Sequence, residues 1–191
     1  MPRVNHMIWR LFRPNPEDHS IGELYGAIVA QARAPEFYRD YGVPDTVQGR
    51  FDLIVLHLVL LIDRLGREAG AARGIGQRLF DAFCRDLDDN LREMGVGDLA
   101  VPKRMRGFGE AFYGRQAAYL AAFAAADNRE LEKALRRNIF QDADVERGAA
   151  RLARYVRAAR AQFAGQEDGA LLRGEVAFPQ PQSIAEAIDH A

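Results

Sequence analysis

Carboxylates crowd one short stretch of the chain, and paired carboxylates can act as a general acid and a general base. Asp81, Asp88 and Asp89 fall on one face of a predicted helix, and Asp86 and Glu93 fall on another. Two arginines, Arg85 and Arg92, interleave these acids at helical spacing. This interleaving is typical of a solvated face held by salt bridges. We therefore interpret the stretch first as a solvated face, then as a docking site for a basic partner segment, and last as a catalytic site.

The other residues that catalysis needs are scarce. The only serines and threonine are Ser20, Ser183 and Thr46. Because neither serine falls in a predicted core element and Thr46 is placed to cap a helix, a hydrolase with a hydroxyl nucleophile is disfavoured. His57 stands within the most apolar stretch, where a neutral, hydrogen-bonded core histidine is the usual finding. The single cysteine, Cys84, cannot form an internal disulfide and is predicted to be a small core or near-core residue.

Metal and phosphate chemistry lack their usual patterns as well. No Glu-x-x-His pair and no Cys/His zinc spacing is present. Gly74-Ile75-Gly76 lacks the preceding strand and the Gly-Lys-Ser/Thr ending of a phosphate loop. The sequence therefore predicts no catalytic residue, no metal and no cofactor, and so a protein that is not an enzyme. A small helical enzyme built on Asp88, Asp89 and His57 is the remote alternative, and it requires His57 to reach a cavity.

Positive charge begins where the acidic stretch ends. A turn containing Gly95, Gly97 and Asp98 leads into a helix whose first residues include three cations. These cations are Lys103, Arg104 and Arg106. Cations at a helix N-terminus oppose the helix macrodipole, at a cost of about 0.3–1 kcal/mol each. A partner would offset that cost, and the candidates are the nearby acidic helix and an external anion.

A second set of cations lies on the last strong helix. Four arginines share its polar side at helical spacing, and they are Arg147, Arg151, Arg154 and Arg157. Such a face could touch phosphate, including ribosomal RNA, or it could be solvated. The formal net charge of the chain is only −1, so no overall field draws it to nucleic acid or membrane, and we expect no DNA partner.

The elements that position these residues are helices, because apolar residues recur at helical spacing along most of the chain. The predicted helices are 21–32, 35–42, 46–67, 77–94, 102–126, 131–139 and 144–163. Residues 53–62 are apolar on nearly every side, which predicts a central buried helix. That run is shorter than the roughly 20 residues that span a bilayer, so an integral membrane protein is not expected. The sequence predicts an all-α fold, one compact multi-helix domain of about seven helices.

The chain divides by composition into three parts. We predict an N-terminal arm at 1–15, an all-helical domain at 16–165 and a polar C-terminal tail at 166–191. Trp9 and several arginines allow a peripheral membrane contact for the arm, and a frayed arm or one docked on its own domain is the favoured interpretation. Glycines at 66, 70, 74 and 76 predict a flexible joint. Whether the aromatic residues Phe37, Tyr38 and Tyr41 are core or an exposed patch stays open.

Three segments resemble the ubiquinol–cytochrome c chaperone family. They are residues 42–52 (GVPDTVQGRFD), 79–106 (LFDAFCRDLDDNLREMGVGDLAVPKRMR) and 110–115 (EAFYGR), within a similarity that runs from about 24 to about 163. Members of the family are assembly factors for cytochrome b of the respiratory ubiquinol–cytochrome c reductase, complex III. The resemblance implies a chaperone that binds newly synthesised cytochrome b and promotes assembly of the reductase without catalytic turnover.

The resemblance also implies partners and a place of action. The partners are nascent cytochrome b, the ribosome near its tunnel exit and a small assembly-factor partner protein. The place is the cytoplasm, with peripheral contact at the inner face of the membrane. By motif match, the implied partner-binding residues are Asp88, Asp89, Arg92, Gly95, Gly97, Asp98, Lys103, Arg104, Arg106, Tyr113 and Arg115. The main alternative is a ribosome- or RNA-binding factor that uses the arginine-rich helix face and has no dedicated client.

Overall fold

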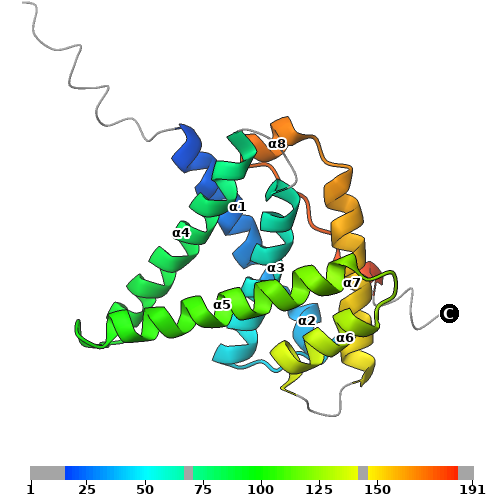
Figure 1. Cartoon of the computed structure of the whole chain (residues 1–191), viewed down its shortest axis with the longest axis horizontal. Helices are drawn as coiled ribbons and strands as arrows, with labels where there is room; N and C mark the ends of the chain where they lie inside the picture. The colour runs from blue at the N-terminus through cyan, green and yellow to red at the C-terminus, as the bar shows by residue number, and fades with distance from the viewer. Residues whose placement is uncertain (1–15, 67–70, 142–145, 185–191) are drawn as a thin grey trace, which may run out of the picture.

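The computed structural model describes residues 16–66, 71–141 and 146–184 of the 191-residue chain. These residues form eight α-helices and one π-helical turn, and they contain no strand (Figure 1). The elements are α1 Pro16–Ala32, α2 Pro35–Arg39, α3 Val47–Gly66, α4 Ala71–Glu93, α5 Val101–Ala124, α6 Arg129–Leu135, η1 Arg136–Phe140, α7 Glu146–Ala164 and α8 Asp168–Leu172. The prediction of an all-α fold in one compact domain is confirmed, with one more α-helix than the seven expected.

Helix α3 is the centre of the fold because it is apolar on almost every side. Leu53 and every residue from Val55 to Leu61 are buried. The helix packs against α1, α4, α5 and α7, and Figure 1 shows α5 crossing in front of it. The prediction that this run forms a central buried helix is confirmed.

The start of α3 is fixed by two local features. The backbone N–H of Gly49 donates to Oγ1 of Thr46 over 3.1 Å, so Thr46 caps the helix as predicted. A Cβ atom at Gly49 would lie 2.0 Å from the carbonyl oxygen of Pro44. The chain passes too close there for any residue but glycine.

An aromatic cluster joins α2, α3 and α7. The Phe37 ring centroid lies 4.8 Å from that of Tyr155 and 5.3 Å from those of His57 and Tyr41. Phe37 and Tyr41 are buried, and Tyr38 is partly buried against the same core. These aromatic residues are therefore core residues and not an exposed patch. Cys84 is likewise partly buried against the core, as predicted.

His57 is the polar centre of this cluster. Its Nδ1 lies 2.7 Å from the carbonyl oxygen of Leu53, and its Nε2 lies 2.9 Å from the Tyr155 hydroxyl. A carbonyl can only accept, so Nδ1 carries the proton and Nε2 accepts from the tyrosine. Gln31 in turn donates to the Tyr155 oxygen. Burial lowers the pKa of His57 to about 4, so the histidine is a neutral core residue, as predicted.

This histidine makes the fold sensitive to acid. Its folded pKa of about 4 lies below its ordinary value of 6.5, so its contribution to stability is complete above pH 6.5 and is lost as the pH falls toward 4. The loss amounts to about 3 kcal/mol. We expect the difference in free energy of unfolding between the natural chain and His57→Gln to shrink by about that amount from pH 6.5 to pH 4. Urea titrations of both proteins measure it, and parallel pH profiles would show that His57 is not the acid-sensitive group.

The segment after Gly165 differs from the polar tail that composition predicts. It forms α8, buries Leu171 and packs Val176 and Phe178 against the core. The Phe178 ring lies 5.1 Å from that of Phe163. The Tyr41 hydroxyl donates to the carbonyl oxygen of Pro181 over 2.7 Å. Residues 166–184 therefore pack as part of the helical body, held by a few isolated apolar side chains.

The expected glycine-rich joint also differs. Gly74 and Gly76 lie inside the first turns of α4, and Gly66 is the last residue of α3. Gly70 and the N-terminal arm lie outside the described residues, so the predicted membrane contact of the arm stays a prediction.

Candidate partner-binding surface

The turn between α4 and α5, here called the α4–α5 corner (residues 88–106), holds most of the predicted site residues. Gly95 adopts a left-handed φ of 77°. Its N–H donates to the carbonyl of Arg92 over 2.9 Å, and the N–H of Val96 donates to that of Leu91 over 3.0 Å. These two bonds are the Schellman pattern that ends a helix, so the prediction that Gly95 ends the helix is confirmed. Figure 1 shows the corner at the far end of α5 from α6.

Arg92 organises the acidic side of the corner. Its Nε lies 2.6 Å from Asp88 and its Nη1 lies 2.6 Å from Asp98. The hydrogen bond that Arg92 donates to Asp88 is the main cause that raises the pKa of the Arg92 guanidinium. The Asp98 side chain is 87% exposed, so water screens these pairs and each contributes little to the stability of the fold. The two ion pairs of Arg92 therefore hold the turn that carries Gly97 in shape, and they add little to the stability of the fold.

Two of the remaining acids of α4 accept hydrogen bonds from other residues of the chain. Gln77 donates to Asp81 over 2.8 Å, and the Tyr25 hydroxyl donates to Asp86 over 2.8 Å. Asp89 is exposed. The acidic side of α4 is thus a solvated face with hydrogen bonds to neighbouring side chains. The sequence favoured this interpretation over a docking site and a catalytic site.

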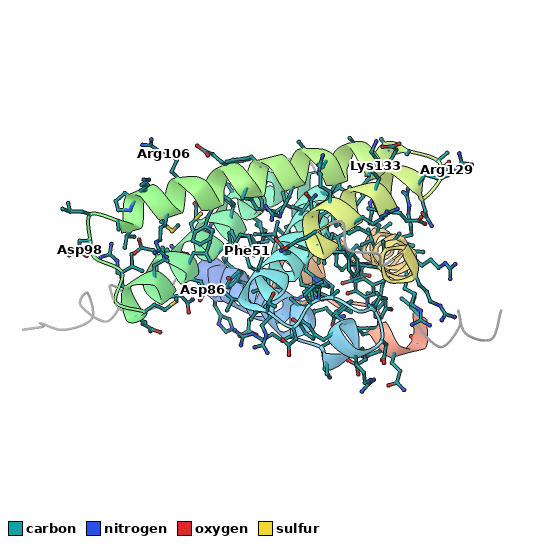
Figure 2. The ribbon with its side chains drawn as sticks, turned by 90° about the horizontal axis from the view of Figure 1, so that it is seen from below. Phe51, Asp86, Asp98, Arg106, Arg129 and Lys133 are labelled. Carbon is teal, nitrogen blue, oxygen red and sulfur yellow. The ribbon has the colours of Figure 1, made fainter. Side chains whose placement is uncertain are left out.

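The basic side of the corner is different. Lys103, Arg104 and Arg106 are exposed on the first turns of α5. None of them forms an ion pair or a side-chain hydrogen bond with another described residue. Figure 2 shows Arg106 pointing away from the molecule. Of the two partners expected to offset the macrodipole cost, the acidic helix does not supply one within the described chain, which leaves an external anion.

Two large apolar side chains are exposed at the same corner. Leu99 is 98% exposed and Met94 is 73% exposed. Helical spacing after Leu91 would place Met94 on the inward face, but α4 ends at Glu93 and the chain turns away at Gly95. Periodicity gives no signal for Leu99, which lies in the turn. The corner therefore presents cations and apolar surface together, a combination found where proteins bind partners.

Tyr113 and Arg115 lie further along α5 and face different ways. Tyr113 is 56% exposed, and its ring centroid lies 5.5 Å from that of Phe80. Arg115 turns inward, with its guanidinium 2.8 Å from the buried carboxylate of Asp52. Its side chain is only 18% exposed, so Arg115 does not share the outward surface with the residues of the corner.

The Asp52–Arg115 pair ties α3 to α5. Asp52 Oδ1 also accepts a hydrogen bond from Gln48 over 2.9 Å. Burial raises the pKa of Asp52 to about 6, against the opposing effects of Gln48 and Arg115. The pair joins two of the segments that carry the family resemblance, 42–52 and 110–115, and its role in this structure is to hold the two helices together.

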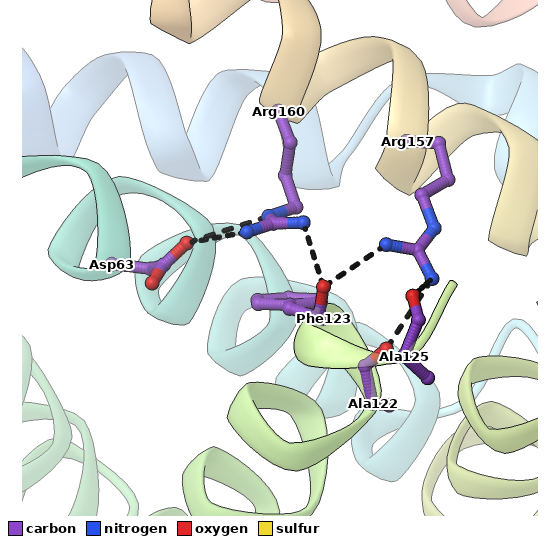
Figure 3. Close-up of polar contacts among 6 residues, drawn as sticks. All are labelled: Asp63, Ala122, Phe123, Ala125, Arg157 and Arg160. Atoms are coloured by element: carbon purple, nitrogen blue, oxygen red, sulfur yellow. Dashed lines mark hydrogen bonds and ion pairs between the residues drawn. The ribbon is translucent and has the colours of Figure 1, made fainter. Parts of the chain in front are cut away.

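Arg157 closes the end of α5 (Figure 3). Helix α5 ends at Ala124 with alanine and not glycine after it, and the last carbonyls of a helix lack donors within the helix. The Arg157 guanidinium donates to the carbonyl of Ala125 over 3.0 Å and to that of Phe123 over 3.2 Å. Arg160 donates to the same Phe123 carbonyl and pairs with Asp63 at 3.3 Å. The negative end of the α5 macrodipole thus offsets the charge of Arg157.

The four arginines of the predicted arginine face do not all point outward. Arg151 donates to the carbonyl of Asp40 at the end of α2 over 2.6 Å, as Arg157 does at the end of α5. Arg147 and Arg154 are exposed. Two of the four arginines serve helix ends inside the molecule, which leaves a smaller outward charge than the sequence pattern indicates.

The described residues offer little for the enzyme alternative. His57 is buried with both ring nitrogens engaged, whereas Asp88 pairs with Arg92 at the surface. Within the described chain, no group of three His, Cys, Asp or Glu residues is arranged to hold a metal ion. No helix in the described ranges has both the length and the apolar character needed to cross a bilayer.

Comparisons with known proteins agree with one another. A family model described as ubiquinol-cytochrome C chaperone matches residues 39–178. The ubiquinol-cytochrome-c reductase complex assembly factor 1 of Xenopus laevis is 28% identical over 169 residues, which cover 86% of this chain and 84% of that protein. The crystal structure of the Cbp3 homolog from Brucella abortus has a TM-score of 0.81 and 38% sequence identity, covering 92% of this chain and 98% of that chain.

Proposed function

Because this chain belongs to the ubiquinol–cytochrome c chaperone family, we propose that it holds newly synthesised cytochrome b and promotes assembly of ubiquinol–cytochrome c reductase without catalytic turnover. The name of the frog relative supports the complex, since that protein is an assembly factor for the same reductase. The observation that carries the binding role is the α4–α5 corner, where three cations without partners in the described chain stand beside the exposed side chains of Leu99 and Met94.

Binding at this corner is suited to holding and release. Leu99 and Met94 offer apolar contact to a segment that has not yet found its place in a membrane complex. Lys103, Arg104 and Arg106 attract an acidic part of the client and set its orientation. Because these side chains are solvated before binding, each contact is modest, and the client leaves when the reductase offers a better one.

We place this activity at the inner face of the membrane, where cytochrome b is inserted. The chain acts there as a peripheral protein, beside the ribosome that delivers the client. The identity of the proposed client supports this location, because newly made cytochrome b must pass from the ribosome to the bilayer. A small partner protein that works with the chaperone would also have room on the exposed surface of the corner.

Ribosomal RNA binding by the arginine face is the weaker candidate. It would draw on four outward cations, but Arg151 and Arg157 donate to carbonyls of the chain itself. Arg147 and Arg154 are exposed, and contacts to at most two phosphates from these residues give only a shallow salt dependence.

Deletion of the gene from its own host tests the proposal. We expect loss of assembled ubiquinol–cytochrome c reductase on native gels, with restoration by the full chain expressed in trans. Other respiratory complexes serve as the internal control, because a general defect of membrane-protein insertion would lower them too. A deletion strain with normal reductase would refute the proposed function.

A further inference from the structure

The outward face of α5 carries a regular line of exposed residues, here called the α5 seam. Its members are Lys103, Arg106, Glu110, Tyr113, Ala117, Leu120 and Ala124. The steps between them alternate between three and four residues, which is the spacing of a coiled-coil interface. All seven are exposed, so the line lies on the outside of the helix from end to end.

The second half of the seam has the composition of a buried surface. Between Arg115 and Asp127 the chain has no charged residue, whereas the exposed face of a helix ordinarily carries charge. Tyr113 is 56% exposed and Leu120 is 38% exposed. In Figure 2, α5 runs along one edge of the molecule with no other helix outside it.

A groove runs beside this half of the seam, between α5 and α6. Its volume is about 420 Å³, with Ala118 and Ala121 on one side and Ala134 on the other, next to the charged residues Glu130, Lys133 and Arg137. Small side chains allow the backbone of a neighbouring helix to come close. The large side chains of Tyr113 and Leu120 would supply the apolar contact.

The first half of the seam is basic. Lys103 and Arg106 form no ion pair with another described residue, and Glu110 is the one acid among the seven. They stand at the N-terminus of α5, where the helix macrodipole is positive and favours a nearby anion. An acidic side chain placed there would be attracted by both the cations and the helix.

We propose that the α5 seam binds an apolar α-helix with an acidic end, whose apolar side chains pack on Tyr113 and Leu120 while its acids lie beside Lys103 and Arg106. The inference rests on the proposed function, in which this helix belongs to the client. The 24 residues of α5 span about 36 Å, enough to lie along a helix of the length that crosses a bilayer.

A second copy of the chain fits the seam poorly. Two parallel copies would set Lys103 and Arg106 against the same cations. Two antiparallel copies would set them against Leu120 and Ala124, which offer no charge. Neither arrangement satisfies the basic half, so the occupant is a different chain with an acidic end.

The probe is a synthetic helical peptide of about 20 residues, with Leu and Ala on one stripe and Glu at one end, labelled for fluorescence anisotropy. The full chain is titrated at low salt against this peptide and against its twin with Lys in place of Glu. We expect the acid-ended peptide to bind about tenfold more tightly, with a preference that fades as salt is added.

Variants locate the binding. Leu120→Glu is expected to weaken binding about tenfold or more, because a carboxylate would be desolvated in the contact. Leu172→Glu is the matched control, since Leu172 on α8 is exposed to the same degree, 40% against 38%, and it should leave binding unchanged. The double reversal Lys103→Glu/Arg106→Glu should invert the preference toward the Lys-ended peptide.

Several results would overturn the proposal. These are absence of saturable peptide binding, equal effects of the two leucine variants, and equal affinity for the two peptides. Vesicles with anionic lipid form the last arm, and seam variants that lower only vesicle binding would assign the seam to a lipid surface and overturn the inference. If Leu120→Glu supports full reductase assembly in the deletion strain, the seam proposal fails while the proposed function stands.

Discussion

Replacing Arg115 with alanine is expected to lower the free energy of unfolding by about 3–5 kcal/mol at pH 8. The change leaves the buried carboxylate of Asp52 without the guanidinium that now lies 2.8 Å away. Asp52 is fully buried, so water cannot take the place of that partner. Urea denaturation followed by circular dichroism measures the loss, and Arg104→Ala, an exposed change on the same helix, should fall within about 0.5 kcal/mol of the natural chain.

The pH dependence of this loss identifies its cause. Burial already raises the pKa of Asp52 to about 6, above its ordinary value of 3.8, and loss of Arg115 raises it further. A raised folded pKa means that the folded state binds the extra proton, so the penalty is largest above the folded pKa and shrinks as the pH falls toward 4. The double variant Asp52→Asn/Arg115→Met should recover much of the stability at pH 8. A penalty that does not change with pH would show that lost packing, and not the unpaired carboxylate, is responsible.

Reversing the charges of Lys103 and Arg104 to glutamate is expected to lower function while the fold gains stability. The two side chains oppose the macrodipole at the start of α5, so acids in their place should raise the free energy of unfolding by about 0.3–1 kcal/mol each. If the corner docks an acidic segment, capture of the client should weaken about tenfold, and assembled reductase should fall several-fold. Thermal denaturation and native gels measure the two effects.

Two single charge reversals serve as controls for this double variant. Arg33→Glu, an exposed change after α1, should leave assembly at the natural level. Arg154→Glu acts on the exposed part of the arginine face, and a loss of assembly there but not at Lys103 and Arg104 would favour the ribosomal RNA candidate. Normal assembly of the reductase in the Lys103→Glu/Arg104→Glu variant would show that the α4–α5 corner does not bind the client.

The helices could be predicted because their information is local. The apolar run of α3, the Thr46 cap and the left-handed Gly95 each act within a few residues. The packing of residues 166–184 could not be predicted in the same way, because Leu171 and Phe178 are isolated apolar residues without periodicity. They pack against surfaces of distant helices, such as the ring of Phe163 for Phe178.

The roles of the arginines at the candidate site likewise depend on contacts between residues far apart in the sequence. In the sequence, Arg115 and Arg157 resemble Arg104 and Arg154, since all four stand on the polar sides of predicted helices. The difference arises only in three dimensions, where Asp52 reaches Arg115 from α3 and the end of α5 reaches Arg157 on α7. A cation that serves the fold and a cation left for a partner therefore cannot be told apart by spacing alone.

The identity of the client is the most direct test of the proposed chaperone function. The tagged full chain is recovered from membrane-attached ribosomes of its own host, and the proteins that accompany it are identified by mass spectrometry. We expect cytochrome b to be enriched above all other membrane proteins, with the enrichment lost in the Lys103→Glu/Arg104→Glu variant. Recovery of ribosomes without cytochrome b, and their release at moderate salt, would contradict it.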